Sequence, residues 1–414
     1  MAIGSMRGVF LLVAAASGWS DLGLGPPLAQ QLAGRFAAPL PIQVAAVPLL
    51  LEGRDAVVHA ETGSGKTLSW ALALQGRGAV VVAPSETLCQ QLRRECAAIG
   101  MAVGDASAVC DVVFGGKELF AVATPYDAMR ALDFADLDGD GGPVAEVGRL
   151  CLVLDEADAL LKTLGKYAAP SAKVERQAVQ DEPAAKLIRR ILRLRPTAQL
   201  VAASATVGRP LKRELESFLK TSTYAREPLA IARVAPRGDA VEASLEQKSK
   251  RFVTAPQGVR HLLASIADAP RDDMRRPSEA ALDGLRRAVT LFGPAARILV
   301  VVADPTASPE RVQKALRAAG YNAVALREYT REASDETRVI VARASSIRGI
   351  DLAAIDYVVS LGRPSSSDEY LHICGRTARA GRNGTALTLA TDHDMGIVKS
   401  WQSQLDLKFQ VVDL

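Results

Sequence analysis

The chain has 414 residues, of which 49% are hydrophobic and 23% are charged, so it can form two or three globular domains with sizeable cores. Its formal net charge is only +4, and the excess lies in the second half: residues 1–225 hold 23 basic and 23 acidic side chains, and residues 226–414 hold 27 and 23. The five scattered cysteines form no C-x-x-C pair, which argues against a disulfide framework and a zinc site and favours a reducing compartment. No apolar run is long enough to span a bilayer, so we expect no membrane segment.

The beginning of the chain allows two interpretations. Its first 20 residues hold one Arg and no acidic residue, and Val9–Ala16 is an apolar run. We therefore expect residues 1–18 to be either a tail or the remnant of a targeting presequence. Residues 19–33 predict a short lead-in followed by a helix, and Val44–Leu51 predicts a second helix.

From residue 57 onward, apolar segments rich in β-branched residues alternate with helical segments. This alternation is typical of a mainly parallel sheet covered by helices on both faces. Strands are expected at residues 57–59, 78–83, 111–114, 119–123, 150–154 and 199–204, and again at 296–303, 323–326, 338–342, 355–361 and 385–389.

A segment with two prolines, Glu227–Asp239, interrupts the alternation and predicts a linker. We therefore expect an α/β fold with a first domain at residues 19–226 and a second at residues 240–414. The two domains would be similar in size.

The stretch Ala56–Trp70 predicts a strand, a glycine turn and the start of a helix. Its spacing is that of a phosphate-binding loop (P-loop), with Ala60 in place of the usual first Gly. The glycines let backbone N–H groups turn toward an anion, and the helix N-terminus adds its positive end. Lys66 would contact the β- and γ-phosphates, and the Thr67 hydroxyl would ligate Mg²⁺. The expected ATP-binding loop comprises Ala60, Glu61, Thr62, Gly63, Ser64, Gly65, Lys66 and Thr67.

A second nucleotide signal follows about ninety residues later. The predicted strand at residues 150–154 ends in Asp155-Glu156-Ala157-Asp158. Ligands of open parallel sheets lie beyond the carboxyl ends of the strands, so these carboxylates can reach the metal held by Thr67. Asp155 would bind Mg²⁺, and Glu156 would orient and deprotonate the water that attacks the γ-phosphate.

The motifs, in this order, resemble the DEAD-box ATP-dependent RNA helicase family, whose four-letter name stands here at residues 155–158. Phe36 and Pro39–Gln43 resemble the adenine-reading Q motif, in which Gln43 would read the adenine edge and Phe36 would stack on its ring. Ser204-Ala205-Thr206 resembles the motif that couples hydrolysis to strand separation. Arg348–Asp351 and His372–Arg379 resemble the last two blocks of the family.

This resemblance covers about residues 19–391 and implies two tandem RecA-like domains, with ATP in the cleft and RNA bridging both lobes. Arg376 and Arg379 would act as arginine fingers that stabilise charge on the γ-phosphoryl oxygens. Asp351 would join the ATP-binding set. Four residues would couple the lobes: Asp158, Ser204, Thr206 and His372. Backbone contacts to RNA are expected at Pro84, Gly115, Gly116, Thr124, Pro125 and Arg348.

Several departures from the family pattern fall on the RNA side. Glu86 and Thr87 replace an Arg and a Glu, and Tyr126 stands where Gly is usual. Arg343-Ala344 replaces Thr-Asp, and Ile373 replaces an Arg. We interpret this pattern as a retained ATP site with weakened or rewired RNA contacts.

We therefore expect an ATP hydrolase that acts on RNA, an RNA-stimulated helicase that separates short duplexes locally or remodels RNA–protein complexes. The alternative is an RNA-binding clamp or scaffold with weak or lost unwinding; a DNA helicase or another P-loop ATPase fits the paired motifs less well. The expected cofactors are ATP and Mg²⁺, and the expected partners are RNA and ribonucleoprotein or ribosome-assembly factors. We expect an intracellular monomer, either cytoplasmic or in a plastid or mitochondrion.

Overall fold

The computed structural model describes residues 11–12, 18–61, 63–137, 149–161, 182–221, 224–234, 241–244, 258–267, 277–293, 295–304, 307–329, 338–347, 352, 355–378 and 382–414. The chain forms two compact units: the first comprises Met1–Ala60 and Ser64–Phe252, and the second comprises Val253–Leu414 with Glu61–Gly63. In the described part of the chain, no helix is both long enough and apolar enough to cross a membrane.

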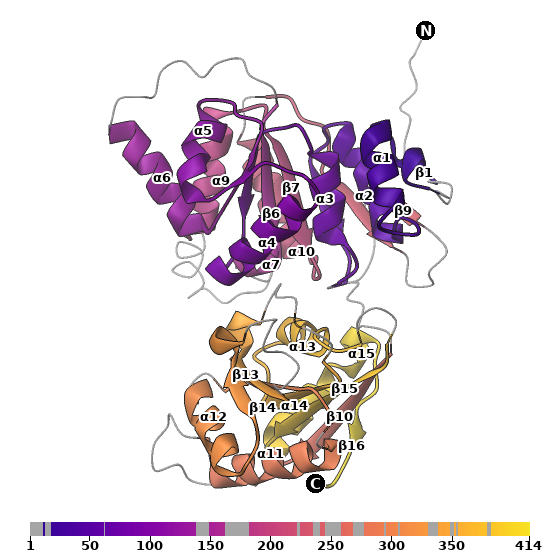
Figure 1. The fold of residues 1–414 in the computed structure, drawn as a ribbon, viewed down its shortest axis with the longest axis vertical. Coiled ribbons are helices and arrows are strands. Elements are labelled where there is room, and N and C mark those ends of the chain that lie inside the picture. Colours follow the sequence, from indigo (N-terminus) through magenta and orange to yellow (C-terminus); the bar gives the residue numbers. More distant parts are fainter. Residues whose placement is uncertain are drawn as a thin grey trace. The chain divides into compact units, whose positions relative to one another are not determined.

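The first unit, coloured from indigo to magenta in Figure 1, is built on a nine-stranded sheet. The strand order is β1-β9-β8-β2-β7-β6-β3-β5-β4. The seven strands from β8 to β4 run parallel, and β1 and β9 pair antiparallel at one edge. The strands are β1 (Leu11–Leu12), β2 (Ala56–His59), β3 (Ala79–Val82), β4 (Val103–Gly104), β5 (Phe120–Ala123), β6 (Cys151–Asp155), β7 (Gln199–Ser204), β8 (Ala230–Val234) and β9 (Val241–Ser244).

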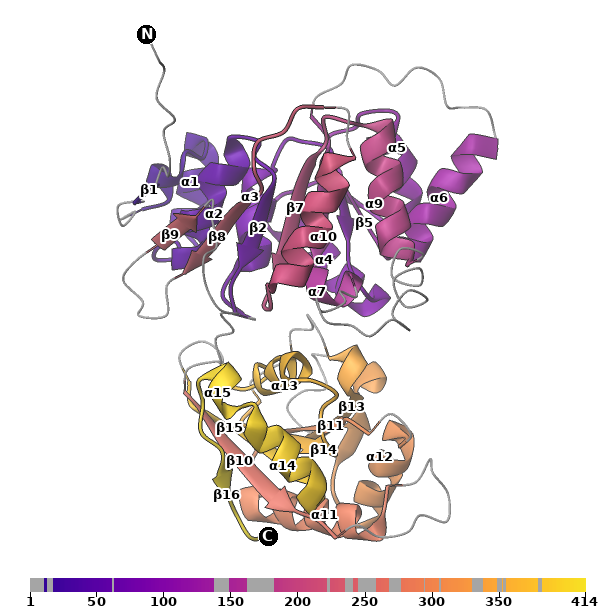
Figure 2. The same cartoon turned by 180° about the vertical axis from the view of Figure 1, so that it is seen from behind.

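Helices cover both faces of this sheet, which is why β2, β3 and β6 are buried along their whole length. Apolar residues of α1 to α4 form one core layer, and those of α5, α6, α7, α9 and α10 form the other. Figure 2 shows α9 and α10 in front of the sheet, on the face opposite to α3 and α4 in Figure 1. The helices are η1 (Trp19–Leu22), α1 (Pro26–Ala33), α2 (Pro41–Leu51), α3 (Lys66–Ala73), α4 (Glu86–Ala98), η2 (Ala106–Ala108), α5 (Val109–Val113), α6 (Pro125–Leu137), α7 (Ala157–Leu160), α9 (Pro183–Leu194) and α10 (Arg209–Lys220).

One predicted strand of the first unit is wrong. Residues 111–114 do not form a strand, because α5 occupies Val109–Val113. Val109, Val112 and Val113 all join the core layer on that face, and their spacing of three and four residues fits a helix. The helix is preceded by a turn in which the Asp105 carboxylate accepts from the Ser107 N–H at 2.9 Å.

Two strands of the first sheet, β8 and β9, come from residues expected to form the linker and the start of the second domain. β8 pairs in parallel with β2, on the side of β2 that does not face β7, and β9 pairs with β8. These residues therefore extend the first sheet. The other five strands expected in this half are confirmed within one or two residues.

The second unit is built on a seven-stranded, fully parallel sheet in the order β12-β13-β11-β14-β15-β10-β16. α11 and α12 cover one face, and α13, α14 and α15 cover the other. All five strands expected here are confirmed, and β10 and β16 are additional. The elements are β10 (Val259–Ser265), α11 (Glu279–Phe292), β11 (Ile298–Val302), α12 (Pro309–Ala318), β12 (Ala323–Ala325), η3 (Leu326–Glu328), β13 (Val339–Arg343), η5 (Ala344–Ser346), β14 (Tyr357–Leu361), α13 (Ser367–Cys374), β15 (Gly384–Ala390), α14 (Asp392–Ser400), α15 (Gln402–Leu405) and β16 (Gln410–Val411).

Candidate active site

The predicted phosphate-binding loop connects the buried strand β2 to α3. Gly63 and Gly65 have φ angles of +82° and +90°, a region that side chains other than glycine rarely adopt. The loop starts against β7, because the Ala60 N–H donates to the Ser204 carbonyl at 3.4 Å. Lys66 Nζ donates to the Ala60 carbonyl at 2.8 Å, across the mouth of the loop. Thr67 lies half-buried in the first turn of α3, and Thr62 lies outside the described residues.

The predicted adenine-reading residues lie beside this loop. Trp19 Nε1 donates to the Phe36 carbonyl at 3.1 Å, and the two rings lie 6.1 Å apart between centroids. The Phe36 ring is 41% exposed, so it can contact a ligand. Gln43 is buried; its Oε1 accepts from the Leu40 N–H at 2.7 Å, and its Nε2 faces Gly65. A carbonyl oxygen has a second lone pair, so the amide keeps capacity for both donor and acceptor roles.

The acidic motif lies at the carboxyl end of β6. Asp155 is the last residue of the strand, and Glu156 caps α7 with a left-handed backbone at φ +54°. Such a conformation is strained for a residue with a side chain, and it directs the chain sharply into α7. Burial, together with the neighbouring Glu156 carboxylate, raises the pKa of Asp155 from 3.8 to about 7, and Lys66 opposes that rise. The site is thus an acidic cluster with one nearby ammonium.

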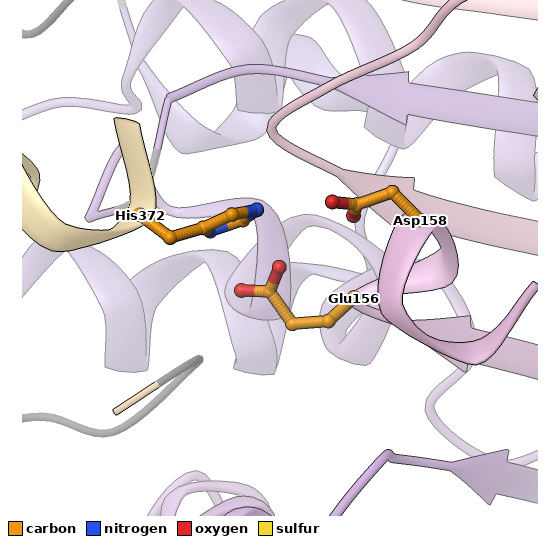
Figure 3. Close-up of side chains that lie close together, drawn as sticks. All are labelled: Glu156, Asp158 and His372. Atoms are coloured by element: carbon orange, nitrogen blue, oxygen red, sulfur yellow. The ribbon is translucent and has the colours of Figure 1, made fainter. Parts of the chain in front are cut away.

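Asp158 connects β6 to the end of β7. Its two carboxylate oxygens accept from the Ser204 hydroxyl at 2.6 Å and the Thr206 hydroxyl at 2.8 Å. The Thr206 N–H also donates to Ser204 Oγ at 3.0 Å. Figure 3 shows the Glu156 and Asp158 side chains, which come from the beginning of α7. Three of the four residues predicted to couple the lobes therefore form one hydrogen-bonded network within the first unit.

In the second unit, the predicted arginine-finger segment follows α13. His372, also drawn in Figure 3, lies in the last turn of this helix. Arg376 Nε donates to the His372 carbonyl at 3.1 Å, which fixes the base of the guanidinium against the helix end. Three predicted site residues of this half of the chain lie outside the described residues: Arg348, Asp351 and Arg379.

The predicted RNA-binding residues of the first unit follow neighbouring strands. Pro84 follows β3, and Thr124 and Pro125 follow β5, which pairs with β3 in parallel. Thr124 Oγ1 accepts from the Asp127 N–H at 3.3 Å, which caps α6, and donates to the Asp127 carboxylate at 2.6 Å. Gly115 and Gly116 form the turn after α5, where Gly116 has a φ of +61°.

Two features of the candidate site were not expected from the sequence, one near the predicted RNA-binding residues and one near the phosphate loop. Glu86 forms an ion pair with Arg93, and Arg93 Nη1 also donates to the Val122 carbonyl at 3.1 Å. Their separation of seven residues, two turns of α4, is the sequence signal that could have indicated this pair. His59, at the end of β2, is buried beside Lys66; burial and the Lys66 charge lower its pKa to about 4, which keeps it neutral.

Family models match both halves of the chain. The DEAD/DEAH box helicase model matches residues 40–213, and the helicase conserved C-terminal domain model matches residues 322–381. ATP-dependent RNA helicase DBP8 of Mycosarcoma maydis is 27% identical over 94% of this chain and 80% of its own length. ATP-dependent rRNA helicase RRP3 of Pyricularia oryzae is 26% identical over 91% of this chain, and the chain spans 64% of that relative. ATP-dependent RNA helicase dbp3 of Sclerotinia sclerotiorum is 30% identical over 87% of this chain, which spans 57% of it.

Solved structures show the same fold. S. cerevisiae Dbp5 bound to RNA and ADP BeF3 is 19% identical, with a TM-score of 0.66 and coverage of 96% of both chains. Mss116p bound to ssRNA and AMP-PNP is 16% identical, with a TM-score of 0.66, 96% coverage of this chain and 80% of its own. The predicted fold of two tandem RecA-like domains is therefore confirmed. With its ordered motifs, its two family matches and its relatives along nearly the whole chain, this protein belongs to the DEAD-box family of ATP-dependent RNA helicases, as a distant member.

Proposed function

We propose that this helicase hydrolyses ATP at the loop between β2 and α3 and uses the reaction to separate short RNA duplexes locally or to remodel RNA–protein complexes. One observation carries the proposal. Three strands that are neighbours in the sheet, β2, β7 and β6, end in the phosphate loop, the Ser204–Thr206 segment and the acidic motif. A nucleotide bound at the end of β2 would lie close to the ends of β7 and β6, because ligands of parallel sheets bind at the carboxyl edge.

The residues at this edge have separable roles. Lys66 would neutralise the β- and γ-phosphates, and the loop N–H groups would hold them with the help of the α3 N-terminus. Glu156 would orient the attacking water and accept its proton. Phe36 and Gln43 would select adenine by stacking and by hydrogen bonds to its edge.

The donor set fits Mg²⁺. Two neighbouring carboxylates, Asp155 and Glu156, are both buried, so a cation would compensate the negative charge that they place there. Mg²⁺ prefers oxygen ligands and keeps several waters, so Asp155 and the Thr67 hydroxyl would hold it together with ATP phosphates. When bound, the ion supplies positive charge that stabilises the transferring phosphoryl group.

Activity would require the second unit as well. We assign Arg376 and Arg379 as guanidinium donors to the γ-phosphoryl oxygens, with Asp351 in the nucleotide set and His372 as a coupling residue. RNA would contact Pro84, Gly115, Gly116, Thr124 and Pro125 of the first unit and Arg348 of the second, mainly through its backbone. The rRNA helicases among the relatives support ribosome-assembly partners, and we propose a monomer that works inside the cell.

The alternative, an RNA clamp with weak unwinding, is favoured by one contact. In the family pattern an Arg stands at position 86, and here Glu86 instead neutralises Arg93. A groove that has lost one positive charge and masked another would hold the phosphate backbone less strongly. Both functions keep the ATP site, so they differ in strand release alone.

ATP turnover with and without RNA, together with duplex separation, tests the proposal. We expect RNA to stimulate turnover, Lys66→Ala to abolish nucleotide-dependent activity, and Glu156→Gln to retain ATP binding but accumulate an ATP-bound, RNA-bound state. RNA-stimulated turnover without strand release would favour the clamp. Normal turnover by Glu156→Gln would contradict the assignment of the general base.

A further inference from the structure

Two helices of the first unit, α9 and α10, carry the positive charge excess of the chain. α9 has four basic and no acidic residues, and α10 has four basic and two acidic residues. Together they hold a formal charge of +6, whereas the whole chain, with 50 basic and 46 acidic residues, holds only +4. The rest of the chain therefore sums to −2, so the net excess comes from these two helices.

The two helices lie side by side on one face of the first sheet (Figure 2). Arg189 of α9 connects them, because its guanidinium lies 5.1 Å from the centre of the Phe218 ring and 3.9 Å from the Glu214 carboxylate. Ile188 and Leu215 are buried in the core layer beneath them. Since the apolar residues of each helix face the sheet, most of the charged residues point away from it.

The acidic residues of α10 are already paired. Glu214 contacts Arg189, and Glu216 lies 3.6 Å from Lys212. Within the described part of the chain, four exposed cations of the two helices form no ion pair, and we call them the basic face: Arg193, Arg209, Arg213 and Lys220. Cations that cluster along helices without carboxylate partners attract a polyanion, and such a cluster is typical of nucleic-acid binding.

The helix that carries part of the basic face begins at the predicted RNA path. Pro183, the first residue of α9, lines a groove together with Pro84, Thr124 and Pro125, which are predicted RNA contacts. α9 has twelve residues and is therefore about 18 Å long. It leads away from the groove and ends shortly before β7 begins, at the opposite edge of the sheet. RNA that extends beyond the groove can therefore follow α9 along this face.

We propose that the basic face is a second RNA contact, which holds the backbone of the strand that flanks the ATP-dependent site. This inference rests on the proposed RNA-binding function and adds a contact that the family motifs do not include. Lys and Arg bind phosphates without reading bases, so the contact has no sequence preference. Both helices belong to the first unit, so the contact requires neither ATP nor the arginine fingers. RNA is favoured over an acidic protein because α9 starts at the groove that RNA is expected to occupy.

Fluorescence anisotropy on the full chain, with labelled six- and thirty-nucleotide RNA strands of the same repeated sequence, tests the proposal. The test variant is Arg193→Gln/Arg213→Gln/Lys220→Gln; Arg209 stays unchanged because it lies close in sequence to Thr206. Without nucleotide, the variant should bind the long strand more weakly, and its slope of log K against log salt should be shallower by about 2, from about 0.7 for each of three lost contacts. The advantage of wild type should therefore shrink by roughly 20-fold between about 50 and about 200 mM salt. With AMP-PNP and Mg²⁺, the two proteins should bind the short strand equally.

Two control variants separate the position of the charge from its amount. Lys314→Gln/Lys399→Gln/Lys408→Gln removes the same charge from exposed lysines of the second unit and should bind the long strand as wild type does. Arg193→Lys/Arg213→Lys keeps the charge and should retain binding, because a phosphate needs only a nearby cation.

The outcomes separate this inference from the function on which it rests. An unchanged salt slope for the long strand, or an equal loss in the two triple variants, would overturn the second contact and leave the proposed function intact. Polyglutamate that displaces the long strand from wild type as effectively as unlabelled RNA would overturn it in favour of an acidic protein partner. Wild-type protein that binds neither strand, while AMP-PNP still binds, would overturn the proposed function and this inference together.

Discussion

The clearest test of the fold around the ATP site is the removal of one buried ion pair. Arg226 Nη1 contacts the two oxygens of Asp55 at 2.9 and 2.8 Å, and the side chains are only 5% and 4% exposed. Arg226 Nη2 also donates to the carbonyls of Pro196 and Ala198, and Asp55 accepts from the Leu200 N–H. Asp55 immediately precedes β2, the strand that leads into the phosphate loop, and Arg226 lies just before β8. The ion pair therefore joins the segment before β8 to the starts of β2 and β7.

Arg226→Met would leave the Asp55 carboxylate buried without its guanidinium and two carbonyls without their donor. Removing one partner of a buried pair costs about 3–5 kcal/mol, and because both groups are buried, solvent screening does not reduce this figure. At an m-value of about 2 kcal/mol/M, the urea midpoint of the first unit should fall by roughly 2 M. Such a loss is a large part of the stability of a typical domain, about 5–15 kcal/mol.

The control for this prediction is the variant that removes both charges. In Asp55→Val/Arg226→Met no charge remains buried, so at least about 2 kcal/mol of the single-variant loss should be recovered. Urea unfolding followed by circular dichroism measures the loss of stability in Arg226→Met and its recovery in the double variant. ATP binding at low denaturant is measured on the same proteins. A loss below about 1 kcal/mol in Arg226→Met, or a double variant as unstable as Arg226→Met, would refute the argument.

Three further changes test other parts of the chain. Burial lowers the pKa of His261, which lies 2.6 Å from the Tyr370 hydroxyl, from 6.5 to about 4. The unfolded state therefore binds the extra proton between these values, and the second unit should lose about 2 kcal/mol of stability between about pH 7.5 and about pH 5. This loss should appear as smaller hydrogen-exchange protection factors along β10, after correction for the intrinsic pH dependence of exchange, and it should be absent in His261→Gln. Gly65→Ala should lower ATP affinity at least about tenfold in a titration, because φ is +90° and the added Cβ would lie 2.7 Å from Gln43 Nε2; unchanged affinity would mean that the loop adopts another shape. Glu86→Arg should strengthen binding to single-stranded RNA and steepen the slope of log K against log salt by about 0.7, one added phosphate contact; an unchanged slope would place the RNA path elsewhere.

The sequence predicted most of the strands because buried parallel strands are short apolar runs bounded by turns. It failed at residues 111–114, where Val112-Val113-Phe114 also suits a buried helix, and periodicity alone does not distinguish the two over so few residues. It also missed β8 and β9, because the prolines on either side of β8 favoured a linker. β8 is held in the sheet by β2, and β9 by β8, and no local pattern reveals these partners.

In the candidate site too, the sequence predicted some neighbouring residues and missed other contacts. Residues within one motif, such as Lys66 and Thr67, were predictable because strand, turn and helix place them together. The resemblance grouped Asp158 and Ser204 as coupling residues but did not predict their contact, and a separation of 46 residues gives no local signal of it. The Asp55–Arg226 pair spans 171 residues and follows from the sheet order, which the pattern of alternation leaves open.

The arrangement along the first sheet explains how one short helix can serve two ligands. In the sheet, β6 lies between β7 and β3, and its end leads directly into α7. On the β7 side, β2 leads into the phosphate loop. On the β3 side, β3 and β5 are followed by Pro84 and Thr124. Glu156 and Asp158 are predicted to act at the ATP site, whereas Ala159 and Leu160, the next residues, line a groove of about 390 Å³ together with Pro84, Thr124 and Pro125. Because α7 has only four residues, we expect a displacement of Asp158 to move Leu160 as well. We therefore expect ATP hydrolysis at Glu156 and RNA contact at this groove to be coupled through α7, within the first unit.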